Sequence, residues 1–262
     1  MNRILGAFAN GKAFIPFITS GDPSLEITER LAVEMAEAGA DLIELGIPFS
    51  DPVAEGEVIQ NANMRALSRG VTVDRIFETA GRIRSKSPVP LVFMTYANPV
   101  FAYGADKFLK NCMEAGVDGL IVPDLPYEEK GEILPYCAKY GITLISMIAP
   151  TSRQRIRMIA KEAQGFVYCV SSMGVTGIRE HIGDEAKEMV ELVRTVSDIP
   201  CAVGFGVSTP EQAARMAQFA DGVIVGSAIV RIIEKYGHEC VPHVTEYVRM
   251  MKDAVVNSVQ SV

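Results

Sequence analysis

The sequence predicts an α/β protein built as one closed (β/α)8 barrel. The chain has 262 residues, 48% of them hydrophobic, and no linker rich in Pro, Gly or Ser divides it. Short aliphatic runs alternate with amphipathic segments along its whole length. One unit recurs, a helix end followed by a small or Gly stop and an aliphatic strand, at 36–46, 113–124 and 217–227. We therefore expect a single domain over residues 1–262.

Eight short apolar runs are the expected strands. Each is continuous rather than alternating, which is typical of parallel strands buried on both faces. The runs cover 13–18, 41–45, 90–95, 117–122, 142–148, 165–170, 199–203 and 221–225.

Amphipathic segments with helical spacing separate these strands. They lie at 24–38, 58–69, 73–85, 105–115, 127–139, 152–163, 184–197 and 209–218. Segments near 227–236 and 239–255 follow the last strand, and we expect extra helices at both the N- and C-terminal ends. An open doubly wound sheet is the alternative, but the first strand leads into TSGDPS and not into a Gly-x-Gly-x-x-Gly turn.

Composition and charge argue against several classes of protein. The net charge is −7 and the Lys and Arg residues are scattered, which predicts no nucleic-acid partner. The five cysteines form no Cys-x-x-Cys pair, as expected for buried thiols in a reducing compartment. No apolar run approaches the ~18 residues of a membrane span, so we expect no membrane contact and a cytoplasmic protein. The three histidines lack metal-ligand spacing, so no metal site is expected.

Glycine-bearing strand ends predict a phosphate site. VGFGVSTPEQ (203–212) and VGSAIV (225–230) place Gly206, Gly226 and Ser227 between a strand and a helix. Glycine lets the backbone approach an anion, and amides at a helix N-terminus attract it. The loops after the last two barrel strands often bind phosphate. We also expect loop 171–183 to act as a lid with Gly177 facing the phosphate.

Glu44 ends the second strand and is the first candidate for catalysis. A carboxylate at a barrel mouth is solvated, paired or catalytic, and the residues themselves leave these three interpretations open. Its apolar neighbours Leu45 and Ile47 would raise its pKa toward a proton-transferring range. The following loop supplies Asp51, Glu55 and Glu57, so a second carboxylate has access to the same substrate. This pattern favours acid–base chemistry on a phosphate ester.

Seven motifs, in this order, resemble the tryptophan synthase alpha subunit family. The likeness runs from about residue 10 to residue 240, and the second motif is highly specific to that family. The motifs are PFITSGDP (16–23), IELGIPFSDPVAEG (43–56), TYANPVF (95–101), GVDGLIVPDLPYEE (116–129), GVTG (174–177), GFG (204–206) and GSAIV (226–230).

This resemblance implies a lyase that cleaves indole-3-glycerol phosphate into indole and glyceraldehyde 3-phosphate. Glu44 matches the family's essential carboxylate, which transfers protons as the C–C bond breaks. Glu55 stands where the family places an aspartate that accepts a hydrogen bond from the indole N–H. The phosphate-binding positions match Gly177, Gly206, Gly226 and Ser227. Positions lining the indole pocket or flanking the phosphate match Phe17, Tyr96, Ile121, Tyr168 and Phe205.

The resemblance also implies a partner, a β subunit with which the chain forms an α2β2 heterotetramer. Pyridoxal phosphate belongs to that β subunit, so no cofactor is expected on this chain. The implied docking surfaces are loop 47–60 and residues 97–101, with Pro52, Asn98 and Pro99 as contacts and both prolines in exposed turns.

Three residues depart from the family pattern. Glu55 replaces an aspartate, Glu57 stands where many relatives carry proline, and Ser172 stands where many carry arginine. Two alternatives therefore stay open. The chain is either a lyase that needs no partner, or a barrel that keeps phosphate binding and docking but has lost efficient catalysis.

Overall fold

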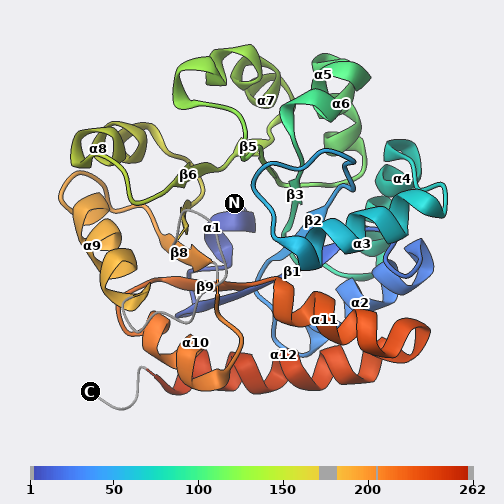
Figure 1. Cartoon of the computed structure of the whole chain (residues 1–262). Helices are drawn as coiled ribbons and strands as arrows, with labels where there is room; N and C mark the ends of the chain where they lie inside the picture. The colour runs from blue at the N-terminus through green and yellow to red at the C-terminus, as the bar shows by residue number, and fades with distance from the viewer. Residues whose placement is uncertain (1–2, 171–181, 205, 259–262) are drawn as a thin grey trace.

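A computed structural model describes residues 3–170, 182–204 and 206–258. Nine parallel strands form a nearly closed barrel surrounded by helices (Figure 1), as the sequence predicted. The strands are β1 Ala13–Thr19, β2 Ile43–Gly46, β3 Leu91–Met94, β4 Gly119–Ile121, β5 Thr143–Leu144, β6 Ser146–Ile148, β7 Val167–Val170, β8 Cys201–Gly204 and β9 Gly222–Val225.

The ninth strand arises because the predicted strand 142–148 is divided at Ile145. The strand order is β5-β4-β3-β2-β1-β9-β8-β7-β6, so the two halves of that strand stand at its two ends. The first half pairs with β4 and the second with β7. The Ile145 N–H still donates to the Leu120 carbonyl oxygen at 2.9 Å. One stretch of chain thus changes partners and closes the ring.

Two helical regions differ from the sequence prediction. The segment 127–139 divides into the 3₁₀ helix η1 and the helix α7, because Pro135, which lacks an N–H, is suited to a helix start. Residues 97–103, which lie outside the predicted helical segments, form the helix α5. Pro99 lies in the first turn of α5 and is half-buried, as is Pro52, so the expectation of exposed turn prolines was wrong.

The remaining helices lie close to the predicted segments. They are α1 Arg3–Gly6, α2 Leu25–Glu37, α3 Glu57–Ser68, α4 Val73–Lys86, α5 Ala97–Tyr103, α6 Ala105–Glu114, η1 Tyr127–Glu132, α7 Leu134–Tyr140, α8 Arg153–Glu162, α9 Ile182–Arg194, α10 Pro210–Ala217, α11 Ser227–Tyr236, η2 Gly237–Glu239 and α12 Cys240–Asn257. The long α12 packs along α2, α10 and α11 (Figure 1).

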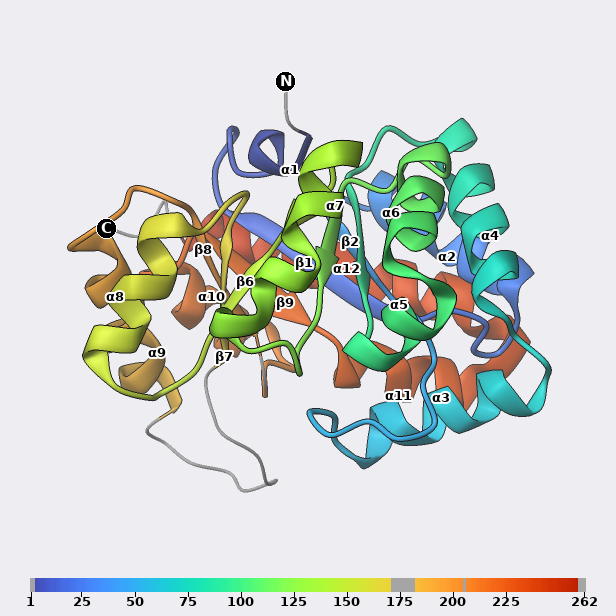
Figure 2. The same cartoon turned by 90° about the horizontal axis from the view of Figure 1, so that it is seen from above.

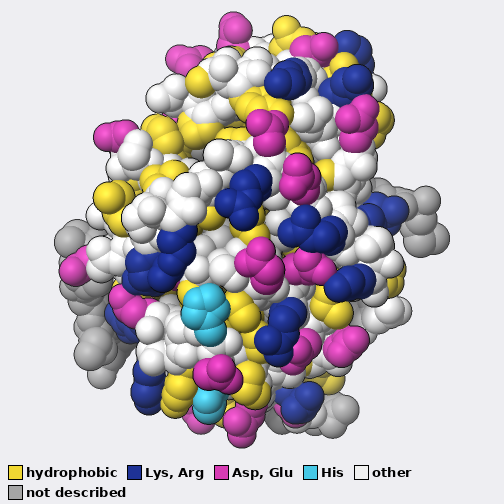
Figure 3. All heavy atoms as spheres, turned by 90° about the vertical axis from the view of Figure 1, so that its right-hand side faces the viewer, with side chains coloured by type: hydrophobic (Ala, Val, Ile, Leu, Met, Phe, Trp, Pro, Cys, Tyr) yellow, Lys and Arg dark blue, Asp and Glu magenta, His cyan; other side chains and the backbone are white. Residues whose placement is uncertain are grey.

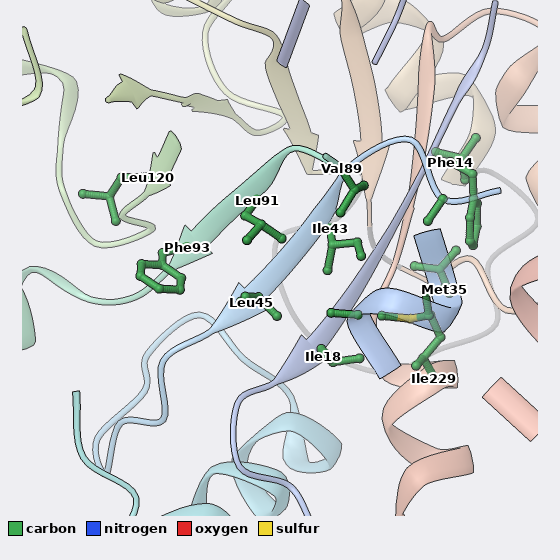
Figure 4. Packing of buried hydrophobic residues seen from close by; sticks show 14 of the residues in the cluster. Phe14, Ile18, Met35, Ile43, Leu45, Val89, Leu91, Phe93, Leu120 and Ile229 are labelled. Atoms are coloured by element: carbon green, nitrogen blue, oxygen red, sulfur yellow. The ribbon is translucent and has the colours of Figure 1, made fainter. Parts of the chain in front are cut away.

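Alternation along the strands separates two buried layers. On β2, Ile43 and Leu45 join the outer layer, which lies between the strands and helices such as α2 and α11 (Figure 4). Leu42 belongs to the inner layer inside the barrel. Successive strand residues point to opposite faces, so Glu44 also faces the interior. Its neighbours in register are Phe17 on β1 and Val92 on β3.

The short helix α1 covers the amino ends of the strands. Its Ile4 is fully buried, and a Cβ built on Gly119 of β4 would lie 2.9 Å from the Ile4 Cδ1 atom. Figure 2 shows α1 at one end of the barrel and α3, with the loop that leads into it, at the other. The carboxyl ends of the strands therefore stay accessible on the side of α3.

The surface and the cysteines agree with the composition. Lys and Arg are interspersed with Asp and Glu on the face seen in Figure 3. Within the described residues, no helix combines the length and apolar character needed to cross a membrane. The predicted buried thiols are confirmed, because all five cysteines are free and buried: Cys112, Cys137, Cys169, Cys201 and Cys240.

Candidate active site

Glu44 is fully buried at the inner face of β2, and neither of its carboxyl oxygens has a hydrogen-bond partner among the residues that the structure describes. Burial raises its pKa from the ordinary 4.5 to about 8. A carboxyl group with such a pKa is mostly protonated at neutral pH, and both of its forms are accessible. This is the property required of a group that alternately donates and accepts a proton.

Three hydroxyl groups near Glu44 are buried as well. The side chains of Thr19, Ser20 and Thr95 are buried, and their oxygens have no hydrogen-bond partner within the described part of the chain. All three lie at or just past the carboxyl ends of β1 and β3, the strands on either side of β2. Unpaired buried polar groups are rare and costly, and they gather where a protein has a use for them. Their clustering marks this end of the barrel as the functional one.

Glu55 lies in the loop between β2 and α3 and is half-buried. Its carboxylate Oε2 accepts a hydrogen bond from the Asn63 Nδ2 at 2.7 Å. Burial raises the pKa of Glu55, and hydrogen bonds with Asn63 and Tyr96 oppose that rise. The Tyr96 hydroxyl accepts the Ala54 N–H at 3.1 Å, and burial raises the pKa of this tyrosine to about 12. Glu55, Asn63 and Tyr96 therefore form one hydrogen-bonded group just past the carboxyl ends of β2 and β3.

Two aromatic rings lie against glycines in the adjoining strands. A Cβ on Gly46 would be 2.6 Å from the Phe17 ring, and one on Gly226 would be 3.3 Å from it. A Cβ on Gly204 would lie 2.5 Å from the Tyr168 hydroxyl. These glycines leave the room that the rings occupy.

Tyr168 also belongs to the surroundings of Glu44. Burial raises the pKa of Tyr168 well above its usual range, and the charge of Glu44 adds to that rise. Ile121 is buried in the same inner cluster as Tyr168. The structure thus brings Glu44, Tyr168 and Ile121 to the interior of the barrel.

The predicted phosphate residues lie around the start of α11. Gly226 precedes this helix, its carbonyl oxygen accepts the Val230 N–H at 3.1 Å, and Ser227 is the exposed first helical residue. Gly206 is exposed with a φ of 76°, a conformation that favours glycine. A Cβ on Gly226 would lie 3.3 Å from the Phe17 ring, so this helix start lies close to the residue that neighbours Glu44 on β1. Gly177 and Phe205 lie outside the described residues.

The implied docking residues lie on the same side of the molecule. Asn98 is exposed, and the exposed fractions of the nearby Val53 and Phe101 side chains are 79% and 45%. Two large apolar side chains therefore face solvent on loop 47–60 and on α5.

Sequence reasoning missed Asn63 and the three unpaired hydroxyls. The buried stripe of α3 is otherwise apolar or small, formed by Ile59, Ala62 and Ala66, and Asn63 lies within it with 3% of its surface exposed. An amide within such a stripe was the available signal, because a buried polar side chain needs a partner. The hydroxyls give no comparable signal, since Ser and Thr are common at strand ends.

In the described residues, no group of three or more His, Cys, Asp or Glu side chains is arranged to hold a metal ion. A buried carboxyl group and a second, hydrogen-bonded one lie at the carboxyl ends of parallel barrel strands, next to glycine-bearing helix starts. Fold and candidate site together define the class of protein, a (β/α)8-barrel enzyme with ionisable side chains at its catalytic face.

The chain belongs to the tryptophan synthase alpha chain family. The model of that family matches residues 7–256. The tryptophan synthase alpha chain of Lacticaseibacillus casei is 47% identical over 255 residues, which cover 97% of this chain and 96% of the relative.

Solved structures agree with this family. The tryptophan synthase alpha subunit of Legionella pneumophila superposes with a TM-score of 0.89 at 38% identity, covering 98% of this chain and 99% of that one. A chain of the tryptophan synthase α2β2 complex of Pyrococcus furiosus superposes with a TM-score of 0.85 at 37% identity, covering 92% and 98%.

Proposed function

We propose that Glu44 and Glu55 carry out the alpha reaction of tryptophan synthase, the retro-aldol cleavage of indole-3-glycerol phosphate to indole and glyceraldehyde 3-phosphate. The chain is a carbon–carbon lyase of L-tryptophan biosynthesis by its family. The observation that carries the residue assignment is the complete burial of Glu44 inside the barrel, with no hydrogen-bond partner in the residues described.

Glu44 supplies both proton transfers. Its protonated form gives a proton to C3 of the indole ring, which leaves positive charge on the ring nitrogen. The resulting carboxylate takes the proton of the glycerol hydroxyl next to the bond to be broken. The hydroxyl oxygen then forms a carbonyl, and the electrons of the C–C bond return to the ring as indole. A pKa of about 8 makes both forms of Glu44 accessible near neutral pH.

Glu55 stabilises the positive charge that develops in between. Its carboxylate accepts the hydrogen bond of the ring N–H, an interaction that becomes stronger as the nitrogen becomes cationic. The hydrogen bond from Asn63 favours the ionised form of Glu55 and works against the effect of burial.

The substrate is held at both of its ends. Backbone amides at Gly206, Gly226 and Ser227, together with Gly177, bind the phosphate at the start of α11. The side chains around the indole ring and the phosphate are Phe17, Tyr96, Ile121, Tyr168 and Phe205.

A tryptophan synthase β subunit is the partner of this chain, as in the α2β2 complex of Pyrococcus furiosus. Docking uses loop 47–60 and α5, with Pro52, Asn98 and Pro99 as contacts. The solvent-exposed Val53 and Phe101 side chains support this surface, because large apolar groups on a surface mark interaction sites. Pyridoxal phosphate is bound by the β subunit, and both subunits act in the cytoplasm.

The decisive experiment follows glyceraldehyde 3-phosphate release from indole-3-glycerol phosphate by the purified chain, with and without a tryptophan synthase β subunit. Slow release that the β subunit accelerates is the expected result. Fast release that the β subunit leaves unchanged would favour a lyase that needs no partner. No release in either case, with substrate still bound, would overturn the proposal in favour of a non-catalytic barrel.

A further inference from the structure

We propose that Asn63 is a positioning residue that holds the carboxylate of Glu55 in place for the reaction. The inference rests on the proposed function of Glu55. Asn63 lies on α3 with 3% of its surface exposed, and its Nδ2 donates to the Glu55 Oε2 at 2.7 Å. The amide therefore fixes where the carboxylate stands relative to the ring N–H.

The length of the Glu55 side chain decides whether this hydrogen bond forms. The main chain at Glu55 is tied to α3, because the Gln60 Nε2 donates to the Glu55 carbonyl oxygen at 2.8 Å. Gly56, the next residue, begins the helix as its N-cap. Aspartate at position 55 would withdraw the carboxylate by about one C–C bond, ~1.5 Å. The distance to Asn63 would then exceed the range of a hydrogen bond.

Helix α3 is itself held in place and cannot follow a shorter side chain. Arg65 donates to both carboxylate oxygens of Asp22, at 2.9 and 2.7 Å, and to Glu234 of α11 at 2.7 Å. Asp22, just past β1, is only 2% exposed, and a bidentate pair with a buried carboxylate has a defined geometry. Asn63 lies two residues before Arg65. Its amide is thus a fixed donor at a set distance from loop 47–60.

The hypothesis predicts that the two side-chain lengths compensate each other. Glu55→Asp removes one methylene from the acceptor, and Asn63→Gln adds one to the donor. Each single variant should lower kcat by roughly 10- to 100-fold, since small displacements at a reacting centre are costly. The double variant should recover part of the lost kcat, because the hydrogen bond forms again while the carboxylate stays about one C–C bond back from the ring N–H. Asn61→Gln, on the exposed side of the same helix, is the matched control and should rescue nothing.

The test compares wild type, the two single variants, the double variant and the control, in which Asn61→Gln is combined with Glu55→Asp. It measures their kcat and KM with the β subunit present and their urea unfolding midpoints without substrate. The midpoint should fall in both single variants and recover in the double variant. Additive losses, or a Glu55→Asp variant faster than wild type, would overturn the role of Asn63. If the wild-type chain cleaves nothing, the proposed function fails, and the unfolding midpoints still decide whether Asn63 and Glu55 are coupled.

Discussion

The two ends of the barrel differ in how their polar groups are paired. At the amino end, Asp118 pairs with Arg3 and Arg84 at 2.8 Å each and accepts the Leu91 N–H at 2.9 Å. At the carboxyl end, Asp22 pairs with Arg65, but Glu44 and three hydroxyl groups are buried without any hydrogen-bond partner among the described residues. Paired polar groups thus stabilise the fold at both ends, and the unpaired ones in the described residues lie at the carboxyl end. The carboxyl end keeps costly groups, which is expected where they are needed for a reaction.

Glu44→Gln should give the largest effect that separates the two ends. Glutamine keeps the shape but cannot transfer a proton, so turnover should fall at least ~100-fold while substrate still binds. Glyceraldehyde 3-phosphate release measures turnover, and a substrate titration measures binding. Glu78→Gln, an exposed carboxylate on α4, is the matched control and should leave turnover near wild type. Near-normal turnover in Glu44→Gln would remove the catalytic role of Glu44.

The same variant should change how stability depends on pH. The pKa of Glu44 is about 8 in the folded chain against an ordinary 4.5, so between these values the folded state holds a proton that the unfolded state has lost. This contribution to stability is complete below pH ~4.5 and is lost as pH rises through ~8, by up to roughly 5 kcal/mol. The Glu44→Gln variant should show no such loss of stability as the pH rises. Urea unfolding of both proteins at several pH values would reveal parallel curves if the carboxyl group were not perturbed.

Asp118→Asn should damage the amino end without affecting catalysis. It weakens two ion pairs of a carboxylate whose side chain is 10% exposed, at a cost of about 2–4 kcal/mol in the free energy of unfolding. Turnover of the folded protein should stay near wild type. Asp106→Asn, which alters the exposed pair with Lys139, is the control and should change the unfolding midpoint little. A large loss of turnover from Asp118→Asn would contradict the separation of the two ends.

Gly46→Ala, at the carboxyl end of β2, should give the smallest effect. The added methyl group would meet the Phe17 ring at 2.6 Å and should cost about 1–3 kcal/mol by overpacking. Because Phe17 lines the proposed pocket, KM for indole-3-glycerol phosphate should also rise. Gly81→Ala, within α4 and with nothing within 4 Å of the new Cβ, should instead stabilise by ~0.5–1 kcal/mol. Equal KM values in the two variants would separate Phe17 from the pocket.

Most of the fold could be predicted from the sequence because strands buried on both faces leave continuous apolar runs. The division at Ile145 could not, since it depends on β4 and β7 both pairing with one apolar run. The helix α5 could not be predicted for a different reason. A Pro at position 99 indicates a turn, yet proline is also tolerated in the first turn of a helix.

The candidate site likewise contains residues that the sequence predicts and residues that it does not. Glu44 was predictable because a charged residue interrupts an aliphatic strand at its carboxyl end. For Asn63 the sequence showed only an amide within an apolar stripe and not its partner, since loop 47–60 brings Glu55 to it. Pairs made by such a loop leave no periodic pattern in the sequence.

Chemical labelling of the five buried cysteines would report local opening of the barrel. A thiol reagent reaches a buried sulfur only when the surrounding structure separates, so the labelling rate counts how often each region opens. Cys169 and Cys201 lie on β7 and β8, Cys112 and Cys137 on α6 and α7, and Cys240 on α12. Mass spectrometry of the labelled peptides would therefore resolve which segment of the ring separates first, and whether substrate slows it.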